Sequence, residues 1–203
     1  MSVWMVGQIR CLDCGHTERR ALDLVEIATT PGSCPACGSR SVDYEFNVFH
    51  WSWVTDRLAV GGRIPNRQAM EQLSAAGITH LLSVAPEADD RELAAELGIE
   101  SLLHGCEDDY EPKPPEFLAP AVDFVLRALE NPAAKVHIHC VSGARRSVMV
   151  MLAVLRVLGW SQPEAMRLLT EKRAVAQFVP AYVESVEEYL RGRAAEGAGR
   201  PGI

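Results

Sequence analysis

Apolar and polar positions follow two different periods along most of the chain. From residue 57 onward, short apolar runs typical of buried strands alternate with longer segments whose apolar residues recur at helical spacing. Strands are expected at residues 57–60, 79–84, 99–103 and 136–140. Helices are expected at residues 66–76, 89–97, 115–129, 146–158, 163–171 and 180–190. This alternation predicts an α/β fold with a mainly parallel central sheet that is flanked by helices.

The first 46 residues have a different pattern. Turn-forming Gly, Pro and Ser separate three short alternating runs that predict small strands: Met5–Ile9, Ala21–Ile27 and Val42–Phe46. A β-rich segment this short cannot bury enough apolar surface to fold alone, so it needs a cross-link. We therefore divide the chain into a small domain over residues 1–46, an α/β domain over 47–193 and a flexible tail over 194–203.

Composition and charge exclude several classes of protein. Hydrophobic residues make up 48% of the 203 positions, which argues against wholesale disorder. The formal net charge of −7 argues against a nucleic-acid partner held by phosphate contacts and against docking on anionic membranes. No run reaches the roughly 20 apolar residues of a membrane span, and no signal peptide is evident. We expect a cytoplasmic protein, whose cysteines are reduced.

The segment from His139 to Ser147 (HCVSGARRS) joins an apolar strand to an apolar helix. Backbone N–H groups of such a loop, together with the positive end of the helix dipole, form a cradle for an anion. Cys140 stands at the base of this cradle, where the same dipoles favour the thiolate that attacks phosphorus. The planar guanidinium of Arg146 can hold two phosphoryl oxygens, and the Ser147 hydroxyl can donate to the thiolate. The substrate phosphate is expected to lie against Val141, Ser142, Gly143, Ala144, Arg145 and Arg146.

A phosphoryl-cysteine route also needs an acid that protonates the leaving oxygen and then accepts a proton from water. The loop of residues 105–115 (GCEDDYEPKPP) follows a predicted strand and contains Asp108 and Asp109, the two candidates. Farther along, Arg173 and Gln177 lie between the last two predicted helices and could line the rim of the pocket.

The loop at 139–147 resembles the HCxxGxxR[ST] motif of the cysteine-dependent protein tyrosine phosphatases, and it fits the dual-specificity branch best. Residues 53–62 (WVTDRLAVGG) and 77–84 (GITHLLSV) look like the opening strand of that family and the helix-to-strand join after it. The resemblance implies the fold of a dual-specificity phosphatase. It also implies a general acid a little over thirty residues before the cysteine, which favours Asp108, 32 positions upstream by subtraction, over Asp109.

Four of the six cysteines form two CxxCG motifs, Cys11 with Cys14 and Cys34 with Cys37. The 19 residues between the motifs suit a four-cysteine site for one structural Zn²⁺ in a zinc ribbon, with iron as the rival metal. Residues 1–46 hold four Arg against six Asp and Glu, which disfavours nucleic acid. The ribbon is therefore expected to be a structural cap, or to bind a protein partner.

Together these features predict a phosphatase that hydrolyses phosphomonoesters through a phosphoryl-cysteine intermediate, with no cofactor for catalysis. Its expected substrates are phosphotyrosine and phosphoserine or phosphothreonine in proteins. Two alternatives stay open at this point. One is a phosphatase for phospholipids, nucleotides, RNA or phosphoglycans. The other is a catalytically inactive module that recognises phosphate.

Overall fold

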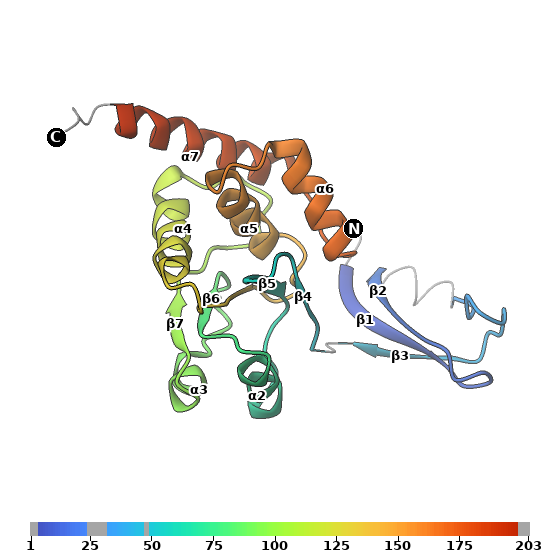
Figure 1. Ribbon diagram of the computed structural model, residues 1–203. Helices are drawn as coiled ribbons and strands as arrows, with labels where there is room; N and C mark the ends of the chain where they lie inside the picture. The colour runs from blue at the N-terminus through green and yellow to red at the C-terminus, as the bar shows by residue number, and fades with distance from the viewer. Residues whose placement is uncertain (1–3, 24–31, 47–48, 199–203) are drawn as a thin grey trace. The chain divides into compact units, whose positions relative to one another are not determined.

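The structure is a computed structural model that describes residues 4–23, 32–46 and 49–198. The chain divides into two units, Met1–His50 and Trp51–Ile203, and each is described by itself (Figure 1). The division falls four residues after the boundary expected at residue 46.

The smaller unit is a three-stranded antiparallel sheet with the order β2-β1-β3. Its strands are β1 (Trp4–Cys11), β2 (Thr17–Asp23) and β3 (Val42–Phe46). β3 has the predicted bounds, but β2 begins four residues earlier than the run predicted to start at Ala21. The turn after Cys11 reverses the chain, so pairing starts at once with Thr17 opposite Arg10. Residues 24–27 of the predicted run lie outside the described residues.

The larger unit has a five-stranded sheet with the order β4-β5-β8-β6-β7. Its strands are β4 (Trp51–Trp53), β5 (Leu58–Gly61), β6 (His80–Ser83), β7 (Glu100–Leu103) and β8 (Val136–His139). The last four strands of this order are parallel, and β4 is antiparallel to β5. The prediction of an α/β fold with a mainly parallel sheet is confirmed. β4 was not predicted, because a run of three residues is too short to show a period.

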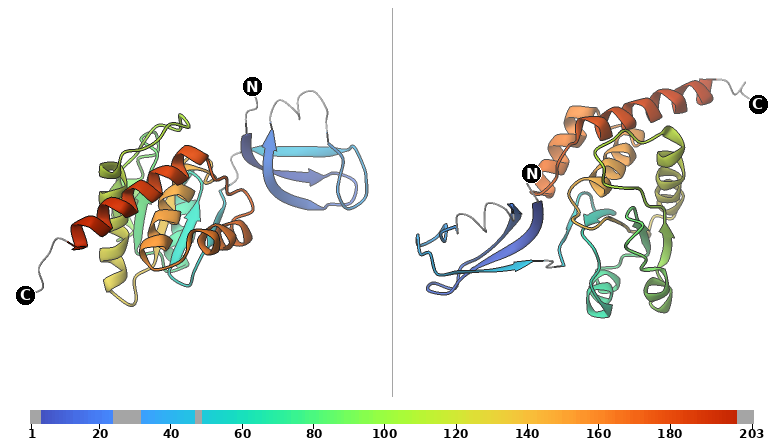
Figure 2. Two further views of the ribbon diagram at one scale, coloured as in Figure 1. Left: turned by 90° about the horizontal axis from the view of Figure 1, so that it is seen from above. Right: turned by 180° about the vertical axis from the view of Figure 1, so that it is seen from behind.

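Helices cover both faces of this sheet (Figures 1 and 2). α2 (Arg67–Ala75) and α3 (Arg91–Glu96) lie on one face, whereas the other carries α4 (Pro115–Glu130), α5 (Arg146–Val157), α6 (Gln162–Lys172) and α7 (Pro180–Ala198). α5 is the central helix of its layer, and its residues from Arg146 to Leu155 are all buried. A helix that is apolar all round is typical of a position inside the core. Its burial fixes the loop that precedes it.

α7 continues past its predicted end at residue 190, through Ala198. Residues 194–198 of the tail predicted over 194–203 are therefore helical, and residues 199–203 lie outside the described part of the chain. The extension carries an ion pair between Arg193 and Asp123 of α4, 2.9 Å from Nη1 to Oδ1. Within the described residues, no helix combines the length and apolar character needed to cross a membrane.

Candidate functional site

The predicted phosphate loop lies between the carboxyl end of β8 and the first turn of α5. Cys140 follows β8 directly and is fully buried. Its Sγ accepts a hydrogen bond from the Gly143 N–H at 3.2 Å and lies 3.3 Å from the Ser147 hydroxyl oxygen. The structure thus brings together the thiol, a loop amide and the serine hydroxyl, as the spacing of the motif predicts.

Residues outside the loop donate hydrogen bonds to the backbone carbonyls of the loop. The Arg63 N–H donates to the Val141 carbonyl at 2.9 Å, and the Gln177 N–H donates to the Ala144 carbonyl at 2.8 Å. Arg173 Nε donates to the Gly143 carbonyl at 2.9 Å. In a trans peptide the C=O and the following N–H point in opposite directions. Outward carbonyls therefore turn the following N–H groups inward, toward the position an anion would take above Cys140.

Gly143 packs too closely for any side chain. Its φ is +63°, in the left-handed region. A Cβ at this position would lie 2.4 Å from the Gly61 carbonyl carbon and 2.3 Å from Arg173 Nη2. Both the backbone conformation and the close approach of β5 therefore require glycine here.

Arg173 lies behind the loop and not at the rim where the sequence placed it. It is the C-cap residue of α6 and its side chain is only 4% exposed. Burial lowers its pKa to about 10, so the guanidinium stays charged at neutral pH. Its position makes it a support of the loop from the side opposite the anion.

We expect Arg173→Met to lower kcat about tenfold or more, because the Gly143 carbonyl loses its donor and the loop amides lose their fixed orientation. The buried carbonyl left without a partner should also lower the free energy of unfolding by about 1–3 kcal/mol. Turnover and urea unfolding measure the two effects. Arg167→Met, at an exposed position of the same helix, is the control. An Arg173→Met variant with unchanged kcat and lowered stability would show a purely structural role.

Arg146 is buried at the start of α5, with its guanidinium held on one side. Nη2 and Nη1 donate to the two carboxylate oxygens of Glu87 at 2.9 and 3.3 Å, and Nη1 also donates to the Cys106 carbonyl at 2.9 Å. The hydrogen bonds from Arg146 lower the pKa of Glu87, which stays ionised. Among the described residues, Arg146 Nε has no hydrogen-bond partner. Glu87 was not predicted, although its place just after a buried strand was a usable signal.

Asp108 lies at the loop, whereas Asp109 does not. Arg145 Nε lies 3.1 Å from both carboxylate oxygens of Asp108, and its Nη2 donates to Oδ2 at 2.8 Å. The Tyr182 hydroxyl donates to Oδ1 at 3.2 Å, and Arg146 Nε lies 3.6 Å from Oδ2. Asp109 is half-exposed and binds Lys113, whose ammonium lowers its pKa. Of the two candidate general acids, the geometry therefore favours Asp108 over Asp109.

Arg145 was predicted to contact the substrate, and in the structure its side chain contacts three other side chains. Besides Asp108, its Nη1 lies 3.5 Å from the Gln177 amide oxygen, and its guanidinium lies 4.9 Å from the centre of the Tyr110 ring. The side chain is 14% exposed. Arg145 therefore holds the acid at the edge of the loop.

Cys106 lies close to the acid but has a different environment from Cys140. Burial raises its pKa to about 11, so its thiol is neutral at physiological pH. Its carbonyl accepts from Arg146, as described above. A neutral thiol is a poor nucleophile, and this site gives Cys106 a structural contact.

In the smaller unit, the four cysteines of the CxxCG motifs meet. Their sulfur atoms lie within 4.8 Å of one another, with 3.7 Å between Cys11 and Cys37 and 3.7 Å between Cys14 and Cys34. Zn–S bonds of about 2.3 Å in a tetrahedral site place sulfurs about 3.8 Å apart. Gly15 and Gly38, each at positive φ, close the two turns. The cluster could therefore hold one metal ion, and the sulfur spacing fits a tetrahedral one.

The comparisons with known proteins agree with this geometry. The family model for the dual specificity phosphatase catalytic domain matches residues 63–191. The chain belongs to this family. The match supports a phosphatase of the dual specificity and tyrosine phosphatase superfamily. Such a domain implies a phosphorylated substrate, and the family needs no cofactor for catalysis.

Solved structures share the fold of this phosphatase domain. A structure of PTPMT1 in complex with PI(5)P has a TM-score of 0.65 and 19% identity, covering 72% of this chain and 98% of its own. Tk-PTP in the active form has a TM-score of 0.62 and 21% identity, covering 70% and 96%. Human DUSP28 has a TM-score of 0.62 and 23% identity, covering 71% and 95%. No curated protein matches the chain.

Proposed function

We propose that this phosphatase hydrolyses phosphotyrosine and phosphoserine or phosphothreonine in proteins through a phosphoryl-cysteine intermediate. The observation that carries the proposal is the convergence on one loop of Cys140, the guanidinium of Arg146 and the carboxylate of Asp108. These groups supply a nucleophile, a cation for the phosphoryl oxygens and a proton donor, which are the three parts that the reaction needs.

In the first step, Cys140 Sγ attacks phosphorus and the bond to the leaving oxygen breaks. The loop N–H groups and Arg146 hold the equatorial oxygens. Asp108 gives its proton to the leaving oxygen, and Ser147 donates to the sulfur. In the second step, Asp108 takes a proton from water, the water oxygen bonds to phosphorus and the thiolate leaves. Arg145 has to release Asp108 before the first proton transfer, because its guanidinium occupies the carboxyl oxygens that would reach the leaving group.

A phospholipid is the second candidate substrate. The observation that favours it is the shared fold with PTPMT1, whose structure contains PI(5)P. The net charge of −7 disfavours approach to an anionic membrane. An inactive binding module is disfavoured by the presence of Cys140, Arg146 and Asp108 together.

A substrate panel tests the proposed function. Para-nitrophenyl phosphate measured with a metal chelator reports the cysteine chemistry. Phosphotyrosine and phosphoserine peptides and vesicles containing PI(5)P then separate the substrate classes. We expect kcat/KM to be highest for the phosphopeptides. A higher kcat/KM for PI(5)P would replace the protein substrate with a lipid, and no turnover on any member by folded protein would favour the binding module.

For the smaller unit, we propose that Cys11, Cys14, Cys34 and Cys37 bind one structural Zn²⁺. Four thiolates complete a tetrahedral shell, so the ion would stabilise the fold and leave no open position for a substrate. The support is the spacing of the four sulfur atoms and the small size of the three-stranded sheet around them. That this unit also binds a protein partner, and that the chain is cytoplasmic, stay predictions.

We expect about one zinc per chain in the purified protein and its loss in Cys34→Ser, because three thiolates hold zinc far more weakly than four. Elemental analysis measures the metal. Cys106→Ser, outside the cluster, should keep it. Iron in place of zinc would correct the identity of the metal, and an unchanged metal content in Cys34→Ser would contradict the site.

A further inference from the structure

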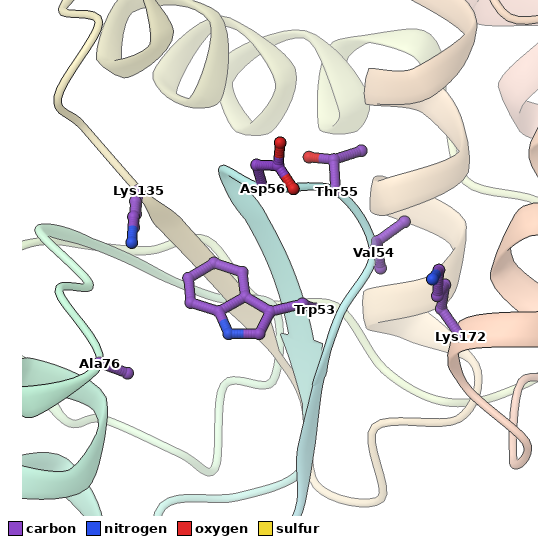
Figure 3. A pocket seen from close by; sticks show the side chains of 7 residues that line it. All are labelled: Trp53, Val54, Thr55, Asp56, Ala76, Lys135 and Lys172. Carbon is purple, nitrogen blue, oxygen red and sulfur yellow. The ribbon is translucent and has the colours of Figure 1, made fainter.

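A cavity lies at the end of the sheet where β5 and β8 begin. Its volume is about 530 Å³ and it is lined by Trp53, Val54, Thr55, Asp56, Ala76, Lys135 and Lys172 (Figure 3). Lys135 directly precedes β8, whereas Cys140 directly follows it. A strand of this length spans roughly 13 Å. None of the lining residues belongs to the catalytic loop of residues 139–147, although Lys172 directly precedes Arg173, which supports that loop.

The lining of the cavity is rich in lysine, which is rare in this chain. Only three of its 20 basic residues are lysines, and two of the three, Lys135 and Lys172, line this cavity. The third, Lys113, is paired with Asp109. In a chain with 27 acidic residues, this places two of the three lysines at one cavity.

Neither cavity lysine has a carboxylate partner among the described residues. Seven arginines of the same unit do form ion pairs with carboxylates: Arg67, Arg91, Arg145, Arg146, Arg156, Arg167 and Arg193. Lys135 Nζ instead lies 5.2 Å from the centre of the Trp53 ring, a cation–π contact. This contact keeps the ammonium at the cavity wall. Figure 3 shows Trp53 between Lys135 and Lys172 in this view.

The remaining lining residues define the ligand further. Asp56 adds one negative charge, so the charged side chains sum to +1 from two lysines and one aspartate. A ligand with two or more negative charges would therefore gain more there than a ligand with one. Trp53 and Val54 offer apolar surface to the body of the ligand. The volume lies within the roughly 300–1,000 Å³ of small-molecule sites.

We propose that this cavity is a second binding site, for a small polyanion that carries at least two phosphate or carboxylate groups. Lys135 and Lys172 bind its anionic groups, because an ammonium is a compact charge with three donors that suits either kind of oxygen. Asp56 weakens the binding of every anion at this site. The assignment does not depend on the phosphatase reaction, because it rests on residues outside the catalytic loop.

Calorimetric titration of the full chain tests the proposal with two probes that are not phosphomonoesters, methylenediphosphonate and benzene-1,3,5-tricarboxylate. Lys135→Gln/Lys172→Gln should weaken binding about tenfold, the factor expected from two surface ion pairs. Asp56→Asn should strengthen it roughly threefold, because it removes a like charge. Arg127→Gln/Arg167→Gln, which removes the same charge elsewhere on the unit, should leave the affinity unchanged.

The lysine and aspartate variants are expected to change the affinity in opposite directions, and three results would contradict the proposal. An equal loss of affinity in the lysine and arginine double variants would show that overall charge alone attracts the probe. Binding that the lysine variant does not change would place the probe in the catalytic loop. If titration with millimolar probe gives no heat of binding, the proposed site is refuted. Turnover of para-nitrophenyl phosphate and thermal unfolding verify that each variant is folded, and Asp56→Asn keeps the test decisive if the lysine variant is not.

Discussion

Cys140→Ser should abolish hydrolysis of para-nitrophenyl phosphate, with kcat falling by at least about 10⁴-fold. A serine hydroxyl is not ionised at neutral pH, so the loop would hold the phosphate but lack a nucleophile. The fold should survive, because the serine oxygen can still accept from the Gly143 N–H that now bonds the sulfur. Stopped assays on wild type and variant, both with a chelator, measure the change.

The control is Cys106→Ser, which removes the other cysteine of this unit and should keep most of the activity. Binding of inorganic phosphate to Cys140→Ser should persist, because its ligands are the loop amides and Arg146. Turnover retained in Cys140→Ser would refute the covalent route. Loss of both turnover and thermal stability would show instead that the variant had unfolded.

Asp108→Asn should lower kcat for alkyl phosphates about 10²–10⁴-fold, the usual contribution of a general acid. The effect on para-nitrophenyl phosphate should be smaller, because nitrophenolate leaves without a proton. Asparagine keeps the shape of the side chain and an oxygen that accepts from Arg145 and Tyr182. The readout is therefore the ratio of alkyl to aryl turnover, which a merely structural defect would not change.

Asp109→Asn is the matched control, since it makes the same chemical change one residue away. Asp109 binds Lys113 and does not contact the loop, so its variant should keep both activities. If the alkyl-to-aryl ratio falls in Asp109→Asn and not in Asp108→Asn, the two acids have been assigned in the wrong order.

The sequence predicted the parts of this molecule that rest on local pattern. Residues 139–147 indicate a strand, a turn and a buried helix by themselves, so the position of Cys140 and Arg146 at one loop followed from the motif. The two CxxCG motifs likewise predicted that four sulfurs meet, and they do. The parallel sheet followed from the alternation of strands and helices.

Contacts between distant segments could not be predicted in this way. Glu87 reaches Arg146 across 59 positions and Arg173 reaches Gly143 across 30, and neither spacing has a local signature. Whether Asp108 or Asp109 faces the loop depends on backbone turns between them and Tyr110, whose φ is +65°. A single chain gives the residue types that can form such pairs, but only the fold shows which of them meet.

The ion pairs of Arg145 and Arg146 with carboxylates affect the rate at which an anionic substrate encounters the loop. Arg145 and Arg146 carry two positive charges, and Asp108 and Glu87 balance them with two negative ones, so these four side chains present no net charge to solvent. Long-range attraction accelerates encounter only where a site projects an uncompensated field. These four side chains should therefore contribute little long-range attraction for an anionic substrate, and the arginines bind phosphate only after contact, when it competes with their carboxylates.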